Sequence, residues 1–151
     1  MKKVILLFFA VTVFASCNKF QERVTIDFQN NRWLTDTWQE HTVVVPADAK
    51  AATINVVFSH IYEPGYKEIP VSVRIKFPDG KEETISAKIL LKDGEGKSLS
   101  DCAGDVCDCI TAIKTDVPLK KGTYIFSLKN NAKHPFLPNA LAAGIQINVS
   151  H

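Results

Sequence analysis

The sequence has almost no excess of charge of either sign. Its 18 Lys and Arg residues and 16 Asp and Glu residues give a formal net charge of +2, and Lys2 and Lys3 account for that difference. Proteins that bind nucleic acid present a basic patch or stripe to the phosphates. The balanced charge therefore excludes a nucleic-acid partner.

The sequence also lacks the patterns of common catalytic and metal sites. No Gly-x-Ser-x-Gly surrounds a serine, so a hydrolase nucleophile is not indicated. The histidines at positions 41, 60, 134 and 151 form no His-x-x-x-His pair for zinc. Asp101, Asp105 and Asp108 do not follow the spacing of an EF-hand calcium loop. We therefore expect no enzyme activity, no cofactor and no metal.

Apolar stripes at helical spacing and internal repeats are missing as well. Short runs rich in Val, Ile, Thr, Phe and Tyr are instead separated by turn residues such as Pro78-Asp79-Gly80. From Val71 to Phe77, apolar and polar residues alternate, as in strands with one buried face. The sequence predicts an all-β fold, a single antiparallel β-sandwich of jelly-roll or immunoglobulin-like type with about eight strands. The expected strands are residues 22–28, 38–45, 52–61, 69–77, 82–90, 106–114, 123–129 and 141–149.

The longest hydrophobic run lies at the N-terminus and is too short to cross a membrane as a helix. Residues 4–13 are apolar except for Thr12, whereas a membrane-spanning helix needs about 20 apolar residues. The run fits a signal peptide. Phe14-Ala15-Ser16-Cys17 resembles the lipobox of bacterial lipoproteins, in which the cysteine receives the lipid, although Phe14 departs from the usual aliphatic residue.

We expect residues 1–16 to be a lipoprotein signal peptide, residues 17–21 the lipidated N-terminus with a short linker, and residues 22–151 the β-sandwich domain. Two or more acyl chains, palmitate among them, anchor a protein stably where one does not. Cys17 is thus the expected lipid attachment site and the membrane the first expected partner. The alternative is an ordinary signal peptide followed by a coincidental cysteine.

Cysteine is scarce, and three of the four cysteines, Cys102, Cys107 and Cys109, lie close together. Beyond the inner membrane, thiols tend to be oxidised. Cys107 and Cys109 are two residues apart in an expected strand, which favours a disulfide from Cys102 to one of them over a strained bridge between the two. The leftover thiol is then buried, paired with another chain, or part of a three-sulfur site for zinc or copper(I). The sequence leaves the choice between Cys107 and Cys109 open.

Four aromatic residues are candidates for contact with a ligand or a partner. Trp33 and Trp38 are the only tryptophans, and Tyr62 and Tyr66 flank a Pro-Gly turn. Exposed aromatic rings stack on sugars, whereas buried ones close the end of a core with their polar atoms paired. The exposure of the two tryptophans separates these interpretations.

Several stretches, in this order, resemble the gliding motility lipoprotein GldH family. They are the lipobox, Asn30 to Trp33, Val56 to Gly80 with His60 and Tyr66, Gly122-Thr123-Tyr124, and the last strand with Gly144. The resemblance covers most of the chain after the signal peptide and departs from the family pattern at residues 98–102, at Cys107 and at residues 131–134.

The resemblance implies a non-catalytic lipoprotein of the cell envelope, anchored at the outer membrane on its periplasmic or surface face. It further implies a structural or scaffolding role beside other envelope proteins of gliding motility or type IX secretion machinery. The alternative function is a surface lipoprotein that binds glycans or another ligand through exposed aromatic residues.

Overall fold

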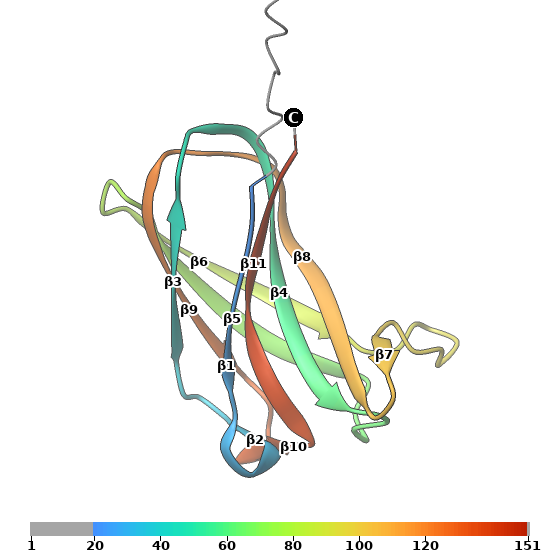
Figure 1. Cartoon of the computed structure of the whole chain (residues 1–151). Coiled ribbons are helices and arrows are strands. Elements are labelled where there is room, and N and C mark those ends of the chain that lie inside the picture. Colours follow the sequence, from blue (N-terminus) through green and yellow to red (C-terminus); the bar gives the residue numbers. More distant parts are fainter. Residues whose placement is uncertain (1–19, 151) are drawn as a thin grey trace, which may run out of the picture.

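The computed structural model describes residues 20–150 and folds them into two antiparallel sheets packed face to face (Figure 1). The five-stranded sheet has the order β1-β11-β4-β8-β7, the four-stranded sheet has the order β3-β9-β5-β6, and β2 and β10 form a short ribbon. The elements are β1 (Gln21–Asp27), the 3-10 turn η1 (Gln29–Asn31), β2 (Arg32–Leu34), β3 (Gln39–Val45), β4 (Ala49–Ile61), β5 (Glu68–Lys76), β6 (Glu82–Leu90), β7 (Asp101–Ala103), β8 (Val106–Leu119), β9 (Gly122–Asn130), β10 (Phe136–Pro138) and β11 (Ala140–Ser150). The prediction of an all-β sandwich is confirmed.

Each expected strand is present in the structure, and the largest difference in length is at β8. This strand continues to Leu119, beyond the expected end at residue 114, and its pairing with β4 contains several register shifts. Three strands were not expected: β2, β7 and β10 have three residues each. Segments of this length carry too few residues for an alternating pattern to identify them.

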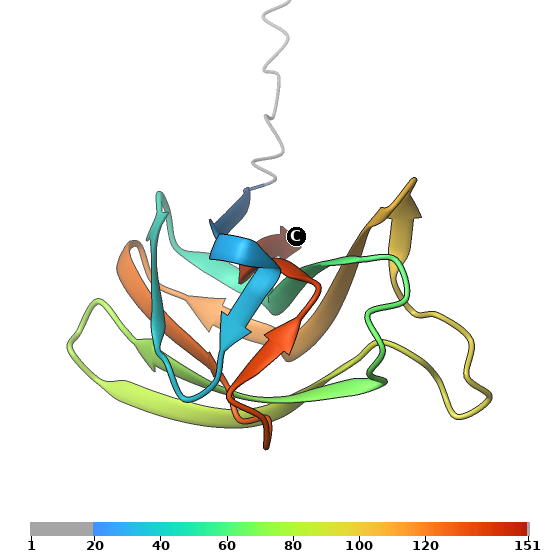
Figure 2. The ribbon, with the colours of Figure 1, turned by 90° about the horizontal axis from the view of Figure 1, so that it is seen from below.

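The core lies between the two sheets, which Figure 2 shows as two layers seen from one end. Alternate residues of each strand face inward, because side chains along a strand point to opposite sides. Fully buried inward residues include Val56, Phe58, Ile145 and Ile147 from the five-stranded sheet and Val43, Val73, Ile89, Phe126 and Leu128 from the four-stranded sheet. Burial of each such side chain contributes about 1.5–3 kcal/mol.

The five-stranded sheet curls so strongly that side chains from β1 and β8 meet across its outer face. Nη2 of Arg23 on β1 lies 2.9 Å from Oδ2 of Asp108 on β8, although β11 and β4 separate these strands. Val57 points to the outer face, because its neighbours on β4, Val56 and Phe58, face inward. Val57 is nevertheless fully buried. Gly144 permits the close approach of β1 to β11, because a Cβ there would overlap the Val24 carbonyl.

The two ends of the sandwich carry different features (Figure 1). At one end, which we call the anchor end, β1 begins at Gln21 and β11 finishes at Ser150. At the opposite end, which we call the far end, lie the β2–β10 ribbon, the connection from β4 to β5 at residues 62–67, and the β7–β8 hairpin. The candidate contact residues from the sequence mostly gather at the far end.

Candidate functional site

The expected lipid attachment site, Cys17, lies outside the described residues, and so do the expected signal peptide and His151. The four residue steps from Cys17 to Gln21 span at most about 14 Å when fully extended. A lipid on Cys17 would therefore place the anchor end close to the membrane and direct the far end away from it. Within residues 20–150, no helix is long and apolar enough to cross a membrane.

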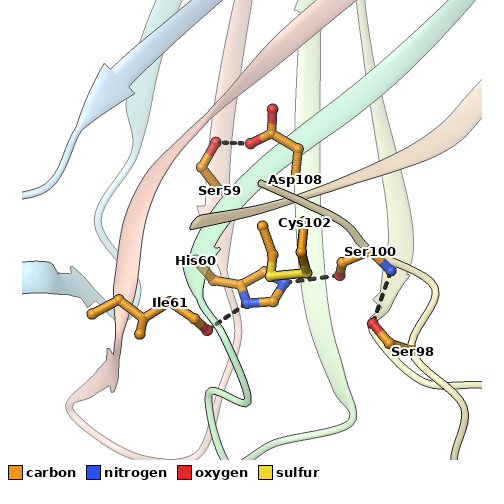
Figure 3. Close-up of a disulfide and its surroundings, with 8 residues drawn as sticks. Ser59, His60, Ile61, Ser98, Ser100, Cys102 and Asp108 are labelled. Atoms are coloured by element: carbon orange, nitrogen blue, oxygen red, sulfur yellow. Dashed lines mark hydrogen bonds between the residues drawn. A yellow bond between two sulfur atoms is a disulfide. The ribbon is translucent and has the colours of Figure 1, made fainter. Parts of the chain in front are cut away.

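A disulfide between Cys102 and Cys107 closes the β7–β8 hairpin at the far end (Figure 3). The two residues are direct register partners, with their Cα atoms 4.0 Å apart. Cys102 is exposed and Cys107 is buried, so the bond fastens an exposed three-residue strand to the core-facing side of β8. Of the two pairings that the sequence left open, the structure contains the one to Cys107.

Cys109 is the leftover thiol and is buried in the core. Its Sγ donates a hydrogen bond to the carbonyl oxygen of Leu90 at 3.2 Å, and burial raises the pKa of the thiol. A buried, protonated thiol is a poor nucleophile and a poor metal ligand. Among residues 20–150, no three His, Cys, Asp or Glu side chains are grouped to hold a metal ion.

His60 connects β4 to the loop that precedes the disulfide. Its Nδ1 lies 2.8 Å from the Ile61 carbonyl oxygen, and its Nε2 lies 2.8 Å from Oγ of Ser100 (Figure 3). A carbonyl accepts only, so Nδ1 donates to it, and Nε2 shares a hydrogen bond with the Ser100 hydroxyl. Asp108, the nearby carboxylate on β8, binds Ser59 and Arg23 rather than orienting His60. The arrangement holds the loop in place, and sequence reasoning missed it because residues 60 and 100 are far apart in the chain.

Asp108 is the acceptor of an ion pair that crosses the outer face of the five-stranded sheet. Burial disfavours its charge, yet hydrogen bonds from Ser59 and Arg23 hold the pKa of the carboxyl below its usual value. The carboxylate therefore stays ionised and fixes β1 against β8. The sequence provided no signal for this contact, since Arg23 and Asp108 are 85 residues apart.

The four aromatic candidates occupy different environments. Trp33 is 0% exposed and stacks between Phe28 and Phe58, so it cannot reach a ligand, and its indole N–H has no partner within the described residues. Of the two interpretations that the sequence left open for Trp33, the structure contains the core role.

Trp38 is half-buried on the outer side of the four-stranded sheet. The guanidinium carbon of Arg74 lies 4.5 Å from the centre of the Trp38 ring, and Nζ of Lys129 lies 5.1 Å from it. Cations above an aromatic ring occupy the surface on which a sugar would stack. The geometry therefore does not favour Trp38 as a glycan platform.

Tyr62 and Tyr66 both lie at the far end, in the connection from β4 to β5. Tyr62 is 57% exposed. Tyr66 is half-buried, donates its hydroxyl proton to the Pro138 carbonyl, and has a pKa raised by burial. Tyr62 is thus the one aromatic candidate whose ring is largely open to solvent.

Two hollows flank this connection on either side of Pro64. The smaller, of about 140 Å³, is lined by His60, Tyr62, Cys107 and residues of the loop after β6. The larger is a groove of about 590 Å³, which we call the proline groove. It is lined by Pro64, Gly65, Tyr66, His134, Pro135, Phe136, Leu137 and Pro138.

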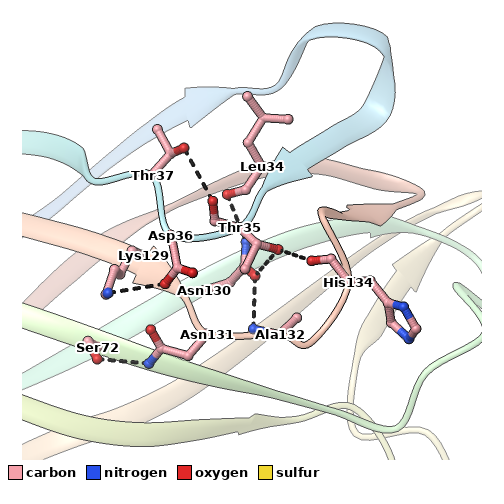
Figure 4. Close-up of polar contacts among 10 residues, drawn as sticks. All are labelled: Leu34, Thr35, Asp36, Thr37, Ser72, Lys129, Asn130, Asn131, Ala132 and His134. Atoms are coloured by element: carbon pink, nitrogen blue, oxygen red, sulfur yellow. Dashed lines mark hydrogen bonds and ion pairs between the residues drawn. The ribbon is translucent and has the colours of Figure 1, made fainter.

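Asn130 supports one wall of the proline groove, and sequence reasoning missed it. The buried side chain donates from Nδ2 to the Leu34 carbonyl and accepts at Oδ1 from Thr35 and Ala132 (Figure 4). Nδ2 also donates to the Trp33 carbonyl. The amide thus fastens β2, and with it β10, to the end of β9. An Asn pair after a strand is a common turn signal, which hides a structural role of this kind.

Similarity to solved structures is distant. A protein from Sulfurospirillum deleyianum is 11% identical, with a TM-score of 0.42, and the match covers 85% of this chain and 98% of that one. The tumour necrosis factor homologue Eiger from S. frugiperda is 13% identical, with a TM-score of 0.36 and 85% coverage of both chains. No curated protein matches the chain.

The family comparison covers nearly the whole described chain. The model of the GldH lipoprotein family matches residues 22–147, from the first strand to the last. The match includes the disulfide hairpin, the proline groove and the strand that leads from the anchor end. The chain therefore belongs to the GldH lipoprotein family.

Proposed function

We propose that the protein is a lipid-anchored scaffold of the outer membrane that takes part in a gliding-motility or type IX secretion complex. The observation that carries this proposal is the family match over residues 22–147, which begins five positions after Cys17 in a lipobox-like sequence. Lipid on Cys17 holds the anchor end at the bilayer, and the far end contacts other envelope proteins.

The chemistry of the far end supports a binding role over a catalytic one. His60, Ser100 and the disulfide pair make contacts that fix the loop and the hairpin in place. The GldH lipoprotein family likewise suggests a non-enzymatic role. Exposed apolar residues at the same end, Tyr62 and Leu99 among them, are suited to a protein contact.

The anchoring step is tested by replacing Cys17 with Ser in the full chain, with Asn18→Ser as the neighbouring control. We expect cells grown with an alkyne fatty acid to label the wild type and Asn18→Ser, and the label and the membrane association to be lost in Cys17→Ser. Equal labelling of Cys17→Ser would show that the cysteine after the signal peptide is coincidental.

The scaffold role is tested by affinity purification of the tagged full chain from cross-linked envelope extracts. We expect motility or secretion components to copurify with the wild type and to be lost with Cys17→Ser. Purification of an intact, lipidated chain that recovers none of these components would contradict the proposed function.

A further inference from the structure

The far end carries most of the exposed large hydrophobic side chains of the described residues. Among residues 20–150, seven large hydrophobic side chains are markedly exposed, and five of them lie at this end: Leu34, Tyr62, Leu90, Leu99 and Val106. Soluble domains rarely gather exposed apolar residues in this way unless they bind something. The proline groove lies at the same end, so the question is what occupies it.

Three cations lie next to the proline groove, whereas Glu63, the carboxylate that precedes Pro64, lines the smaller hollow. The guanidinium carbon of Arg32 lies 4.6 Å from the centre of the Phe136 ring in the groove wall. Lys67 directly follows the groove residue Tyr66, and Lys133 directly precedes the groove residue His134. Both lysines are exposed. Among the described residues, none of these three cations takes part in an ion pair. An occupant with both apolar side chains and carboxylates could pack against the apolar lining and pair with these cations.

The β7–β8 hairpin of this chain has that combination. Leu99 and Val106 are each 50% exposed. Asp101 and Asp105, which lie between them, are exposed and form no ion pair within residues 20–150. From position 99 to position 106 there is no basic residue. The disulfide Cys102–Cys107 fixes the hairpin as a preformed protrusion, which lowers the entropy lost on binding.

The hairpin does not fill the groove of its own chain. No residue of the hairpin is among those that line the groove, and the backbone N–H of Tyr62 donates to the Asp105 carbonyl at 2.8 Å, which holds the hairpin tip on the other side of Pro64. Both features lie at the far end, so copies anchored in one membrane would carry them at a similar height above it.

We propose that the proline groove of one copy binds the β7–β8 hairpin of a second copy. Leu99 and Val106 enter the apolar groove, and Asp101 and Asp105 meet the cations next to it. The protein therefore self-associates at the far end, independently of any other component of the envelope.

Charge reversal tests the contact with the full lipidated chain reconstituted in phosphatidylcholine vesicles. The groove variant is Lys67→Glu with Lys133→Glu, and the hairpin variant is Asp101→Lys with Asp105→Lys. A carbodiimide that couples carboxylates to lysines is applied to equal mixtures of ¹⁵N-labelled and unlabelled protein. Peptides that join the two isotopes report contacts between copies and separate them from contacts within one chain.

We expect wild-type mixtures to give isotope-mixed peptides that join the hairpin carboxylates to Lys67 or Lys133. Each variant alone should form cross-linked dimer at least about tenfold less, because like charges then face each other and the carboxylate–lysine pairs that the carbodiimide couples are lost. A mixture of the groove variant with the hairpin variant should regain dimer, since the reversed charges are again complementary. The control, Lys50→Glu with Lys76→Glu, changes the net charge as the groove variant does but acts elsewhere, and should dimerise as wild type.

Three results with the purified protein would overturn the proposal. They are cross-links within one isotope only, wild-type dimer yield in both variants, and no recovery in the mixture of folded variants. Circular dichroism establishes that each variant is folded. If the groove lysines couple in envelope extracts to a different protein while purified copies stay monomeric, the occupant is a heterologous partner and the proposal fails, although the proposed scaffold function stands.

Discussion

Replacement of Gly144 by Ala should destabilise the sandwich, because this glycine permits β1 to lie against β11. An ideal Cβ at this position would stand 2.7 Å from the Cα of Thr25 and 2.8 Å from the carbonyl carbon of Val24. Carbon atoms in favourable contact are about 3.5–4.0 Å apart, so the two strands must separate by roughly 1 Å. The obstacle is backbone, which cannot rotate away as a side chain can.

We expect Gly144→Ala to lower the free energy of unfolding by about 3 kcal/mol, the upper part of the range for overpacked sites. Without a clash, the change would have the opposite sign, since Ala reduces the entropy of the unfolded chain and stabilises by about 0.4–1 kcal/mol. Urea denaturation of residues 20–151, followed by tryptophan fluorescence, measures the difference.

The matched control is Gly94→Ala, where a new Cβ meets nothing within 4 Å. This variant should stay within about 0.5 kcal/mol of the wild type. A stability of Gly144→Ala equal to or above that of the control would refute the reasoning on β1.

Three further predictions concern the core and the far end. Cys102→Ser with Cys107→Ser should lower the free energy of unfolding by about 2 kcal/mol, the loop-closure entropy of so short a loop. Thiol titration of denatured residues 20–151 should find one thiol in this variant, as in the oxidised wild type, and three in the reduced wild type. Asn130→Ala should lower the free energy of unfolding by about 2–4 kcal/mol in urea denaturation, because several buried hydrogen bonds lose their partner. Its control, Asn131→Ala, loses one bond to a serine and should lower it by under about 1 kcal/mol. Equal losses in the two variants would contradict the assigned role of Asn130. Burial lowers the pKa of His41 from 6.5 to about 4, so the free energy of unfolding should fall by about 3 kcal/mol in all as the pH falls from 6.5 to 4, because the unfolded chain binds the proton more readily. His41→Phe should reduce this loss of stability by that amount. Identical pH profiles of the variant and the wild type would contradict the role assigned to His41.

The strands could be predicted from the sequence because each carries its own signal. In β5, inward Val71, Val73 and Ile75 alternate with polar or half-exposed residues, and the alternation alone sets the strand and its buried face. β2 and β10 have no such signal, since each exists only because a distant segment supplies its hydrogen bonds. β7 pairs with the neighbouring β8, but its three residues are too few for an alternating pattern.

The site was predictable only in part, because it depends on strand register and packing that no local sequence pattern encodes. The closeness of Cys102 to Cys107 in sequence suggested a disulfide, but the choice of Cys107 over Cys109 depends on the register of the hairpin. Trp33 and Trp38 looked alike in sequence, and packing alone separates the buried ring from the one beneath Arg74. The proline groove unites residues 64–66 with residues 134–138, and no local pattern indicates that contact.

The attachment of β1 also has a mechanical consequence. Its seven residues pair with β11 along their whole length, and β1 begins at the end nearest the expected lipid. A pull on the lipid against a partner held at the far end would act along the strand axis, at right angles to the hydrogen bonds between β1 and β11. All these bonds would then share the load at once instead of opening one after another. An edge strand joined in this way can transmit force from a membrane to a protein complex without peeling from its sheet.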